Sequence, residues 1–169
     1  MDHSLMIDLS AIVMADGAVL NINKTFPANA FSEFDSSIDF ASDIAVTGTI
    51  SNLANILFLN ATISFSANLL CDRCLTPFTK EFHIKVEERL AKPDSSEEEG
   101  DYIEYTNDKL LLSETIYQYI FLEVSEKQLC SDDCKGLCTR CGADLNTQPC
   151  SCDTREIDPR LLKLKDFLK

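Results

Sequence analysis

Cysteine is the residue type in this chain whose number and spacing could do chemistry. Eight are present, namely Cys71, Cys74, Cys130, Cys134, Cys138, Cys141, Cys150 and Cys152. Thiolates two residues apart can bind one tetrahedral metal ion, because a tight turn brings both sulfurs to the same side. Soft sulfur ligands favour Zn²⁺ over Mg²⁺ or Ca²⁺. Since no histidine lies within the cysteine cluster at 130–152, the pattern predicts one or two structural zinc ions bound entirely by thiolates.

Two distributions of these ligands are open from the spacing alone. In the preferred one, the last four cysteines form one local site, and the mid-chain pair joins Cys130 and Cys134 in a second. The second site would then tie the C-terminal segment to the middle of the chain. In the other distribution, a single zinc is bound within 130–152 and the mid-chain pair is free.

Two glycines stand where metal-binding turns need them. Gly142 follows Cys141 directly, and Gly136 lies between Cys134 and Cys138. A turn that closes on a cysteine pair needs a residue that tolerates positive φ, and glycine adopts positive φ without strain. We therefore expect this segment to fold tightly around its sulfurs.

Three other uses of cysteine are compatible with the composition and less favoured. Disulfides are typical of small secreted proteins, but residues 1–5 lack the positive segment of a secretory signal. Iron–sulfur clusters also take four thiolates. A thioredoxin-like pair at Cys71 and Cys74 would need the first cysteine at a helix N-terminus, whereas this pair falls between two predicted strands.

Catalytic motifs are absent from the sequence. There is no glycine-rich phosphate loop, nucleophile elbow or zinc-protease motif. His83 lies on the polar side of a predicted strand, which favours an ordinary surface histidine. A catalytic zinc keeps an open coordination position, and a full set of thiolates leaves none. We expect a protein that is not an enzyme and has no small-molecule substrate.

Alternating apolar and polar residues predict a long antiparallel hairpin. The odd positions are apolar over 62–71, and over 78–90 the even positions Phe78, Phe82, Ile84 and Val86 are apolar, with Lys80 interrupting them. The connection at 72–77 places the mid-chain cysteine pair at the hairpin tip. A strand over 44–50 precedes the hairpin, and another over 102–105 is followed by a turn at Asn107 and Asp108.

The apolar period changes from strand to helix after these segments. Ser113 can cap a helix over 113–124, and Asp158 with Pro159 can begin a second one. The first helix has an apolar stripe made of Ile116, Tyr117, Ile120, Phe121 and Val124. Strands followed by helices indicate the α+β class with an antiparallel β-sheet body. We expect a body over 1–129 and a small Cys-rich, zinc-binding C-terminal tail over 130–169.

The negative charge is confined to the body. The net charge is −13, from 15 basic and 28 acidic residues, and seven of each sign lie after residue 130. Residues 1–130 therefore hold 15 − 7 = 8 basic and 28 − 7 = 21 acidic side chains. Such a negative net charge excludes a protein that binds nucleic acid through an extended basic surface. No apolar run approaches the roughly 18 residues of a membrane span, and the acidic run 93–101 is typical of a solvated loop.

Four motifs together resemble the YceD family, the large ribosomal RNA subunit accumulation proteins. They are Cys71-Asp72-Arg73-Cys74-Leu75, the block from Cys130 through Cys134-Lys135-Gly136-Leu137-Cys138 and Cys141-Gly142 to Asn146, then Cys150-Ser151-Cys152, and Asp158-Pro159-Arg160-Leu161. The resemblance covers about residues 46–169. Thr139 stands where many relatives have proline.

The resemblance implies a bacterial cytoplasmic or plastid protein needed for accumulation of 23S ribosomal RNA. Because Asp2 and Asp8 come early and arginine is absent there, no transit peptide is expected, which favours the bacterial cytoplasm. The acidic body suggests an assembly factor that contacts basic large-subunit ribosomal proteins. The alternative is direct binding to 23S ribosomal RNA or its assembly intermediates through tail cations, for which the candidates are Lys135, Arg140, Arg160 and Lys163.

Overall fold

The computed structural model describes residues 6–31, 38–93 and 102–152. The helix expected from Asp158, together with Arg160 and Lys163, lies outside these residues, as do His3 and most of the acidic run. The described chain forms two compact units. One is a β-sheet unit that runs to Leu69 and again from Pro77 to Gln128, and the other joins Leu70–Thr76 to 129–152.

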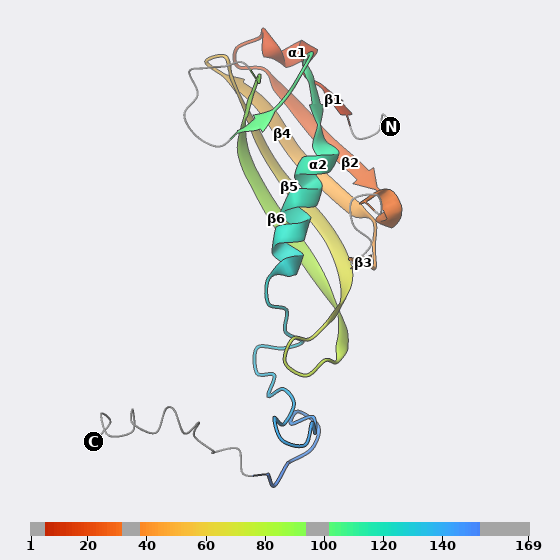
Figure 1. The fold of residues 1–169 in the computed structure, drawn as a ribbon. Coiled ribbons are helices and arrows are strands. Elements are labelled where there is room, and N and C mark those ends of the chain that lie inside the picture. The colour runs from red at the N-terminus through yellow and green to blue at the C-terminus, as the bar shows by residue number, and fades with distance from the viewer. Residues whose placement is uncertain (1–5, 32–37, 94–101, 153–169) are drawn as a thin grey trace, which may run out of the picture. The chain divides into compact units, whose positions relative to one another are not determined.

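A six-stranded sheet forms the frame of the β-sheet unit (Figure 1). Its main order is β2-β4-β5-β6-β7, and β3 pairs with β5 beside this path. The strands are β2 (Val19–Phe26), β3 (Asp39–Phe40), β4 (Ile44–Leu53), β5 (Ile56–Leu70), β6 (Pro77–Ala91) and β7 (Ile103–Glu104). The described pairings of β2, β3 and β4 are antiparallel, and β7 runs parallel to β6.

The predicted hairpin is present as β5 and β6, each 15 residues long. Asn68 of β5 contacts Thr79 of β6, and Ser64 of β5 contacts His83 of β6. The residue numbers fall along one strand as they rise along the other, as antiparallel pairing requires. The odd residues of β5 and the even residues of β6 supply the buried face, as the alternation predicts. The hairpin tip thus lies at residues 71–76.

The β-sheet unit also contains several elements outside the six-stranded sheet. They are β1 (Met6–Asp8), α1 (Ser10–Val13), a 3₁₀ helix (Ala28–Phe31), β8 (Lys109–Leu111) and α2 (Leu112–Ser125). β1 pairs antiparallel with β8 in a separate two-stranded sheet. The sequence pattern does not predict β1, β2, β3, β8 or α1. None of the helices in the described residues is long and apolar enough to cross a membrane.

Helix α2 lies across one face of the sheet and contacts β6 (Figure 1). Ile116 and Ile120 of the expected stripe are buried in the core, whereas Phe121 is 44% exposed. The predicted cap at Ser113 is wrong: the helix begins at Leu112, Leu111 occupies the cap position, and Ser113 is buried. The helix follows β8 without a loop, so burial of Leu110 and Leu112 fixes its start in place of a capping side chain.

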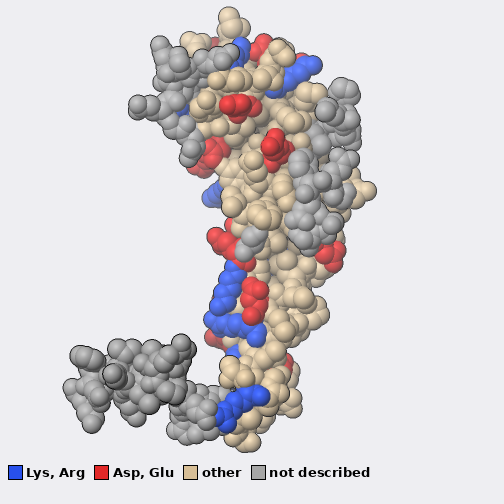
Figure 2. Space-filling model, in the orientation of Figure 1, with Lys and Arg blue, Asp and Glu red and all other residues tan. Residues whose placement is uncertain are grey.

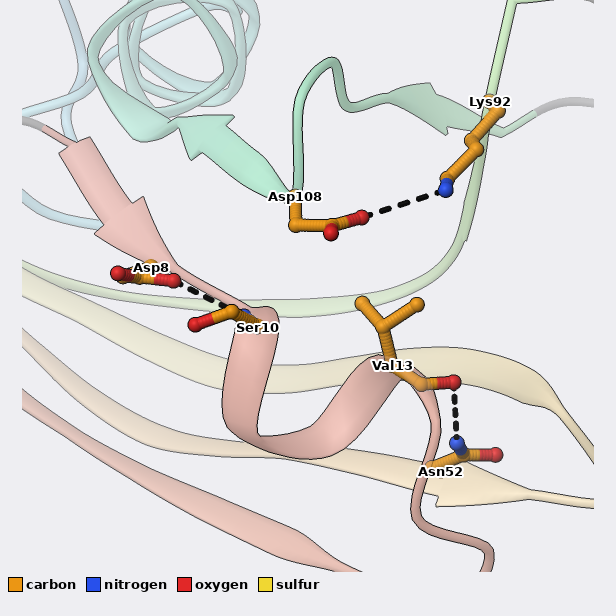
Figure 3. Close-up of polar contacts among 6 residues, drawn as sticks. All are labelled: Asp8, Ser10, Val13, Asn52, Lys92 and Asp108. Carbon is orange, nitrogen blue, oxygen red and sulfur yellow. Dashed lines mark hydrogen bonds and ion pairs between the residues drawn. The ribbon is translucent and has the colours of Figure 1, made fainter.

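A buried asparagine joins the end of β4 to α1. Asn52 is fully buried, and its Nδ2 donates to the carbonyl oxygens of Ile12 at 2.7 Å and Val13 at 3.2 Å (Figure 3). Nearby, the Asp8 carboxylate accepts from the Ser10 backbone N–H at 2.9 Å, and hydrogen bonds from the Ser10 hydroxyl and from this N–H hold the Asp8 pKa below its ordinary value. These contacts satisfy backbone groups that a helix of one turn cannot pair by itself.

Gly48 sets the closest approach between two strands. It pairs with Ala61 across β4 and β5, and a Cβ placed on it would overlap the Asn60 carbonyl oxygen and come within 2.5 Å of the Ala61 Cα. The obstacle is backbone, which cannot rotate away as the end of a side chain can. Any larger residue must therefore separate the strands at the centre of the sheet.

Replacing Gly48 with alanine should destabilise the sheet unit. We expect the free energy of unfolding to fall by about 1–3 kcal/mol, the usual cost of inserting an extra carbon into packed structure. Urea unfolding monitored by circular dichroism measures the loss. Thr47→Ala, at an exposed position of the same strand, is the matched control. Equal stability of the two variants would contradict this role of Gly48.

Candidate metal centres

The hairpin tip presents two cysteines on a tight turn. Between the end of β5 and the start of β6, the Cys71 N–H donates to the Thr76 oxygen at 3.0 Å, and the Leu75 N–H donates to the Cys71 oxygen at 2.8 Å. Leu75 has φ of 59°, a left-handed conformation that is costly for a branched side chain. The turn holds the side chains of Cys71 and Cys74 together at one place.

A second turn of the same form occurs at Cys138 and Cys141. The Gly142 N–H donates to the Cys138 oxygen at 2.9 Å, and Gly142 has φ of 73°. Gly136 also has positive φ, at 75°. The expectation that glycine would relieve the turns is confirmed here. At the hairpin tip, Leu75 takes the equivalent position, which composition does not predict.

The eight sulfurs gather into two groups of four. The first group is Cys71, Cys74, Cys130 and Cys134, and the second is Cys138, Cys141, Cys150 and Cys152. In each group, all four sulfur atoms lie within 4.8 Å of one another. These are the groups of the preferred distribution, and both lie within the smaller unit.

The sulfur separations fit a single ion in each group. Two Sγ–Sγ distances in the first group are 3.6 and 3.7 Å, and two in the second are 3.4 and 3.5 Å. Four sulfurs at about 2.3 Å from one tetrahedral ion stand about 3.8 Å apart. A disulfide would need about 2.0 Å, and all eight cysteines are free. An iron–sulfur cluster places several irons between its thiolates and would spread them further.

The two groups differ in their exposure to solvent. In the first, Cys71, Cys74 and Cys134 are buried and Cys130 is exposed. In the second, only Cys138 is buried. The first group is therefore the more enclosed, and charge on its sulfurs depends more on nearby protein donors.

Backbone amides favour the ionised form of one thiol in each group. Burial opposes ionisation of Cys71, but the N–H groups of Cys130, Cys74 and Arg73 outweigh it and bring its pKa to about 6. The N–H groups of Cys141 and Arg140 lower the Cys138 pKa to about 6 as well.

Neighbouring sulfurs oppose ionisation of other thiols in the same groups. Hydrogen bonding with Cys74 and burial raise the Cys130 pKa to about 12, and hydrogen bonding with Cys150 does the same for Cys152. Four thiolates this close repel one another unless a cation lies among them. The arrangement is therefore suited to a divalent cation, which would stabilise all four charges together.

Polar groups around the first group hold its ligands. Arg73 Nη1 donates to the Cys134 oxygen at 2.8 Å, and the Leu137 N–H donates to the Arg73 oxygen at 3.1 Å. Asn146 Nδ2 donates to Cys134 Sγ at 3.5 Å. Sequence reasoning missed both Arg73 and Asn146. The position of Arg73 inside a C-x2-C pair was a usable signal, whereas nothing in the spacing marks Asn146.

The cations proposed for RNA contact are only partly described. Lys135 and Arg140 are exposed in the smaller unit, and Arg160 and Lys163 lie outside the described residues. Asp132, Asp133 and Asp144 accompany the two described cations in the same segment. Because two of the four lie outside the described residues, the role of these cations stays a prediction.

His83 lies on the exposed face of β6, where the alternation predicts it. Its Nδ1 is 3.1 Å from Ser64 Oγ on β5. A shallow hollow on this face is lined by Ser42, Ser64, Phe65, Ser66, Glu81 and His83. The hollow is wide open to solvent, which matches a surface histidine.

Comparison with known proteins adds the family. Residues 59–168 match the model of the family described as large ribosomal RNA subunit accumulation protein YceD. An uncharacterized protein of Mycobacterium bovis is 25% identical over 170 residues, which covers 97% of this chain and 81% of the relative. An uncharacterized protein of Mycobacterium leprae is also 25% identical, with 97% and 77% covered.

Two plant proteins match a shorter segment. The Arabidopsis thaliana protein named large ribosomal RNA subunit accumulation protein YCED homolog 1, chloroplastic, is 38% identical over 47 residues, or 28% of this chain and 15% of its own. The homologue of the same name from Zea mays is 43% identical over 47 residues, or 27% and 16%. No solved structure matches. Because the family model spans well over half of its residues, the chain belongs to the YceD family of large ribosomal RNA subunit accumulation proteins.

Proposed function

We propose that this protein is a non-enzymatic factor that supports accumulation of 23S ribosomal RNA and assembly of the large ribosomal subunit. In this proposal it acts in the bacterial cytoplasm through contacts with basic ribosomal proteins. The observation that carries it is membership of a family named for large ribosomal RNA subunit accumulation. The two groups of four cysteines support a structural role without catalysis, and the acidic charge supports contacts with basic proteins.

The proposal assigns one structural Zn²⁺ to each group of four cysteines. Zinc is favoured because the donors are all sulfur and their separations suit a tetrahedral ion. Four protein ligands complete the tetrahedral coordination of such an ion, so no position is left for a substrate or an activated water. The metal would shape the smaller unit and take no part in bond-making.

The acidic charge favours protein partners of opposite sign. Residues 1–130 carry the whole net charge of −13. Acidic side chains are scattered over the viewed face of the β-sheet unit and do not gather in one pocket (Figure 2). A spread of charge attracts a basic partner from a distance and discourages RNA, whose phosphates are also negative. Direct RNA binding through Lys135 and Arg140 is therefore the second candidate, and the binding test below separates the two.

Native mass spectrometry of the reduced full chain should show two zinc ions. Lowering the pH should release them, because thiolates must be deprotonated to bind and each proton taken up competes with the metal. Metal affinity should therefore fall as the pH falls and recover when the pH is restored. A protein that is metal-free at neutral pH and still fully ordered over 129–152 would contradict the assignment.

Replacing Cys138 with serine should disorder the local site and leave the sheet intact. We expect this variant to hold one zinc, with amide exchange over 138–152 as fast as in an unfolded chain. Protection of β5 and β6 should stay at the wild-type level, because the core of the sheet unit contains none of these sulfurs. Ser151→Ala, an exposed change between two ligands, is the control. Loss of protection in the strands would show that the units do not fold separately.

A tagged full chain should recover large-subunit ribosomal proteins from a bacterial lysate. Recovery should survive RNase and be lost near 0.5 M salt, because salt shortens the range of exposed charge interactions to a few ångströms. Glu81→Gln with Glu87→Gln should weaken recovery, since both side chains are exposed on β6.

The matched control is Lys85→Gln on the same face of β6, which removes a positive charge and should not weaken recovery. Recovery that RNase abolishes at low salt would contradict the protein-contact proposal and favour direct RNA binding. In that case Lys135→Ala and Arg140→Ala should reduce retardation of 23S RNA fragments in a gel.

A further inference from the structure

We propose that Asn146 couples the two metal sites, so that metal binding at the second group strengthens metal binding at the first. The inference rests on the proposed metal binding and concerns a residue that is not itself a ligand. Asn146 acts as a positioning residue: it lies in the loop of one site and contacts a ligand of the other.

Asn146 belongs by sequence to the second site, between Cys141 and Cys150. Its side chain nevertheless contacts the first. Nδ2 donates to Cys134 Sγ at 3.5 Å, and Oδ1 accepts the Lys135 N–H at 2.7 Å. The amide therefore fixes both the sulfur of Cys134 and the peptide group that follows it.

The asparagine side chain is fully engaged in this position. Besides the bond to sulfur, Nδ2 donates to Asp144 Oδ1 at 2.8 Å, and the Asn146 backbone N–H donates to the same oxygen at 2.9 Å. A primary amide has two N–H donors, and one goes to Asp144 while the other goes to Cys134. Asp144 thus orients the amide so that its second N–H faces the sulfur.

Backbone pairing ties this loop to the turn that carries the second site. The Cys138 N–H donates to the Ala143 oxygen at 2.8 Å, and the Leu145 N–H donates to the Gly136 oxygen at 2.9 Å. Gly136 has positive φ, and the Arg73 oxygen lies 3.0 Å from where a Cβ would be, so a larger residue here would crowd Arg73 at the hairpin tip. When an ion joins Cys138 to Cys150, the loop is closed and Asn146 is held against Cys134.

The chemistry of Cys134 explains why this contact matters. Four thiolates and one Zn²⁺ leave two negative charges, and N–H donors to the sulfurs offset that excess. Cys134 is 3% exposed, so water cannot supply the donor. Without Asn146 its sulfur would carry charge in a buried place with less compensation. Loss of such an outer partner typically weakens metal binding 10–100-fold.

Coupling of this kind is reciprocal. If a closed second loop strengthens binding at the first site, metal at the first site must strengthen binding at the second by the same factor. An outer hydrogen bond with only a local structural role would weaken the first site by the same amount whether or not the second is loaded. This difference is what the experiment measures.

The test uses the full chain loaded with ¹¹³Cd²⁺ for spectroscopy and with Zn²⁺ for affinity. Each four-thiolate site gives its own cadmium resonance, and chelator competition gives the affinity of each site. Asn146→Asp keeps the shape of the side chain and removes the donor, and Asn146→Ala removes both. Thr147→Ala is the matched control, because among the described residues Thr147 Oγ1 bonds Asp144 of the same loop and no cysteine sulfur.

We expect Asn146→Asp and Asn146→Ala to shift the first-site resonance and weaken its affinity 10–100-fold, with Thr147→Ala close to wild type. In a Cys138→Ser background the first site should already be weakened, and adding Asn146→Asp should change it less than threefold. An Asn146→Asp effect of full size in that background would overturn the coupling, as would no effect in the wild-type background. Wild-type chain that binds neither ion would instead overturn the metal assignment itself.

Discussion

The smaller unit depends on the packing of eight sulfur atoms around two points, four at each. Among its described residues, the buried apolar side chains are cysteines alone: Cys71, Cys74, Cys134 and Cys138. Its leucines do not form a core, and Leu70 and Leu75 are each 62% exposed. A unit of this size without an apolar core needs another source of stability, and bound metal supplies about 10–16 kcal/mol in small thiolate sites. The buried side chains of the smaller unit are thus its candidate metal ligands.

The β-sheet unit is held together by different forces. Its core is a continuous set of aliphatic and aromatic side chains, in which Phe65 and Phe82 stack across the hairpin with ring centres 4.9 Å apart. Strands β5 and β6 are joined by the tip at 71–76, which belongs to the smaller unit and contains Cys71 and Cys74. A single hairpin therefore belongs to a core made by hydrophobic burial at one end and to a sulfur cluster at the other.

Sequence reasoning succeeded where one physical signal dominated. Strict alternation placed β5 and β6, and ligand spacing gave the grouping of the cysteines that the structure shows. It failed where tertiary contacts decide. β1 and β8 are three residues each and exist through mutual pairing, which leaves no periodic pattern. The turn between β4 and β5 has positive φ at Ala54 and Asn55, and alanine gives no warning of such a turn.

The sequence predicts the candidate metal ligands, but it does not predict the residues that surround and position them. Cysteine spacing reports which sulfurs can share an ion, but Leu75 and Asn146 gain their roles from the path of the backbone. Leu75 shows this most clearly, because its strained left-handed conformation persists only where neighbouring bonds impose it. Here the Leu75 N–H bond to the Cys71 oxygen imposes it, since that bond closes the turn that sets the two sulfurs together.

The order in which the two sites close follows from chain entropy. In the second group the contacting sulfurs are 9 and 12 residues apart, whereas in the first they are 56 and 63 residues apart. Each doubling of a loop costs only about 0.6 kcal/mol, so the longer closures, between two and three doublings longer, cost about 1.5 kcal/mol more. That difference is small beside the free energy of metal binding, and folding of the intervening strands and α2 reduces it further. Both sites can therefore form, but the local one needs fewer prior contacts, and once closed it presents Asn146 to Cys134.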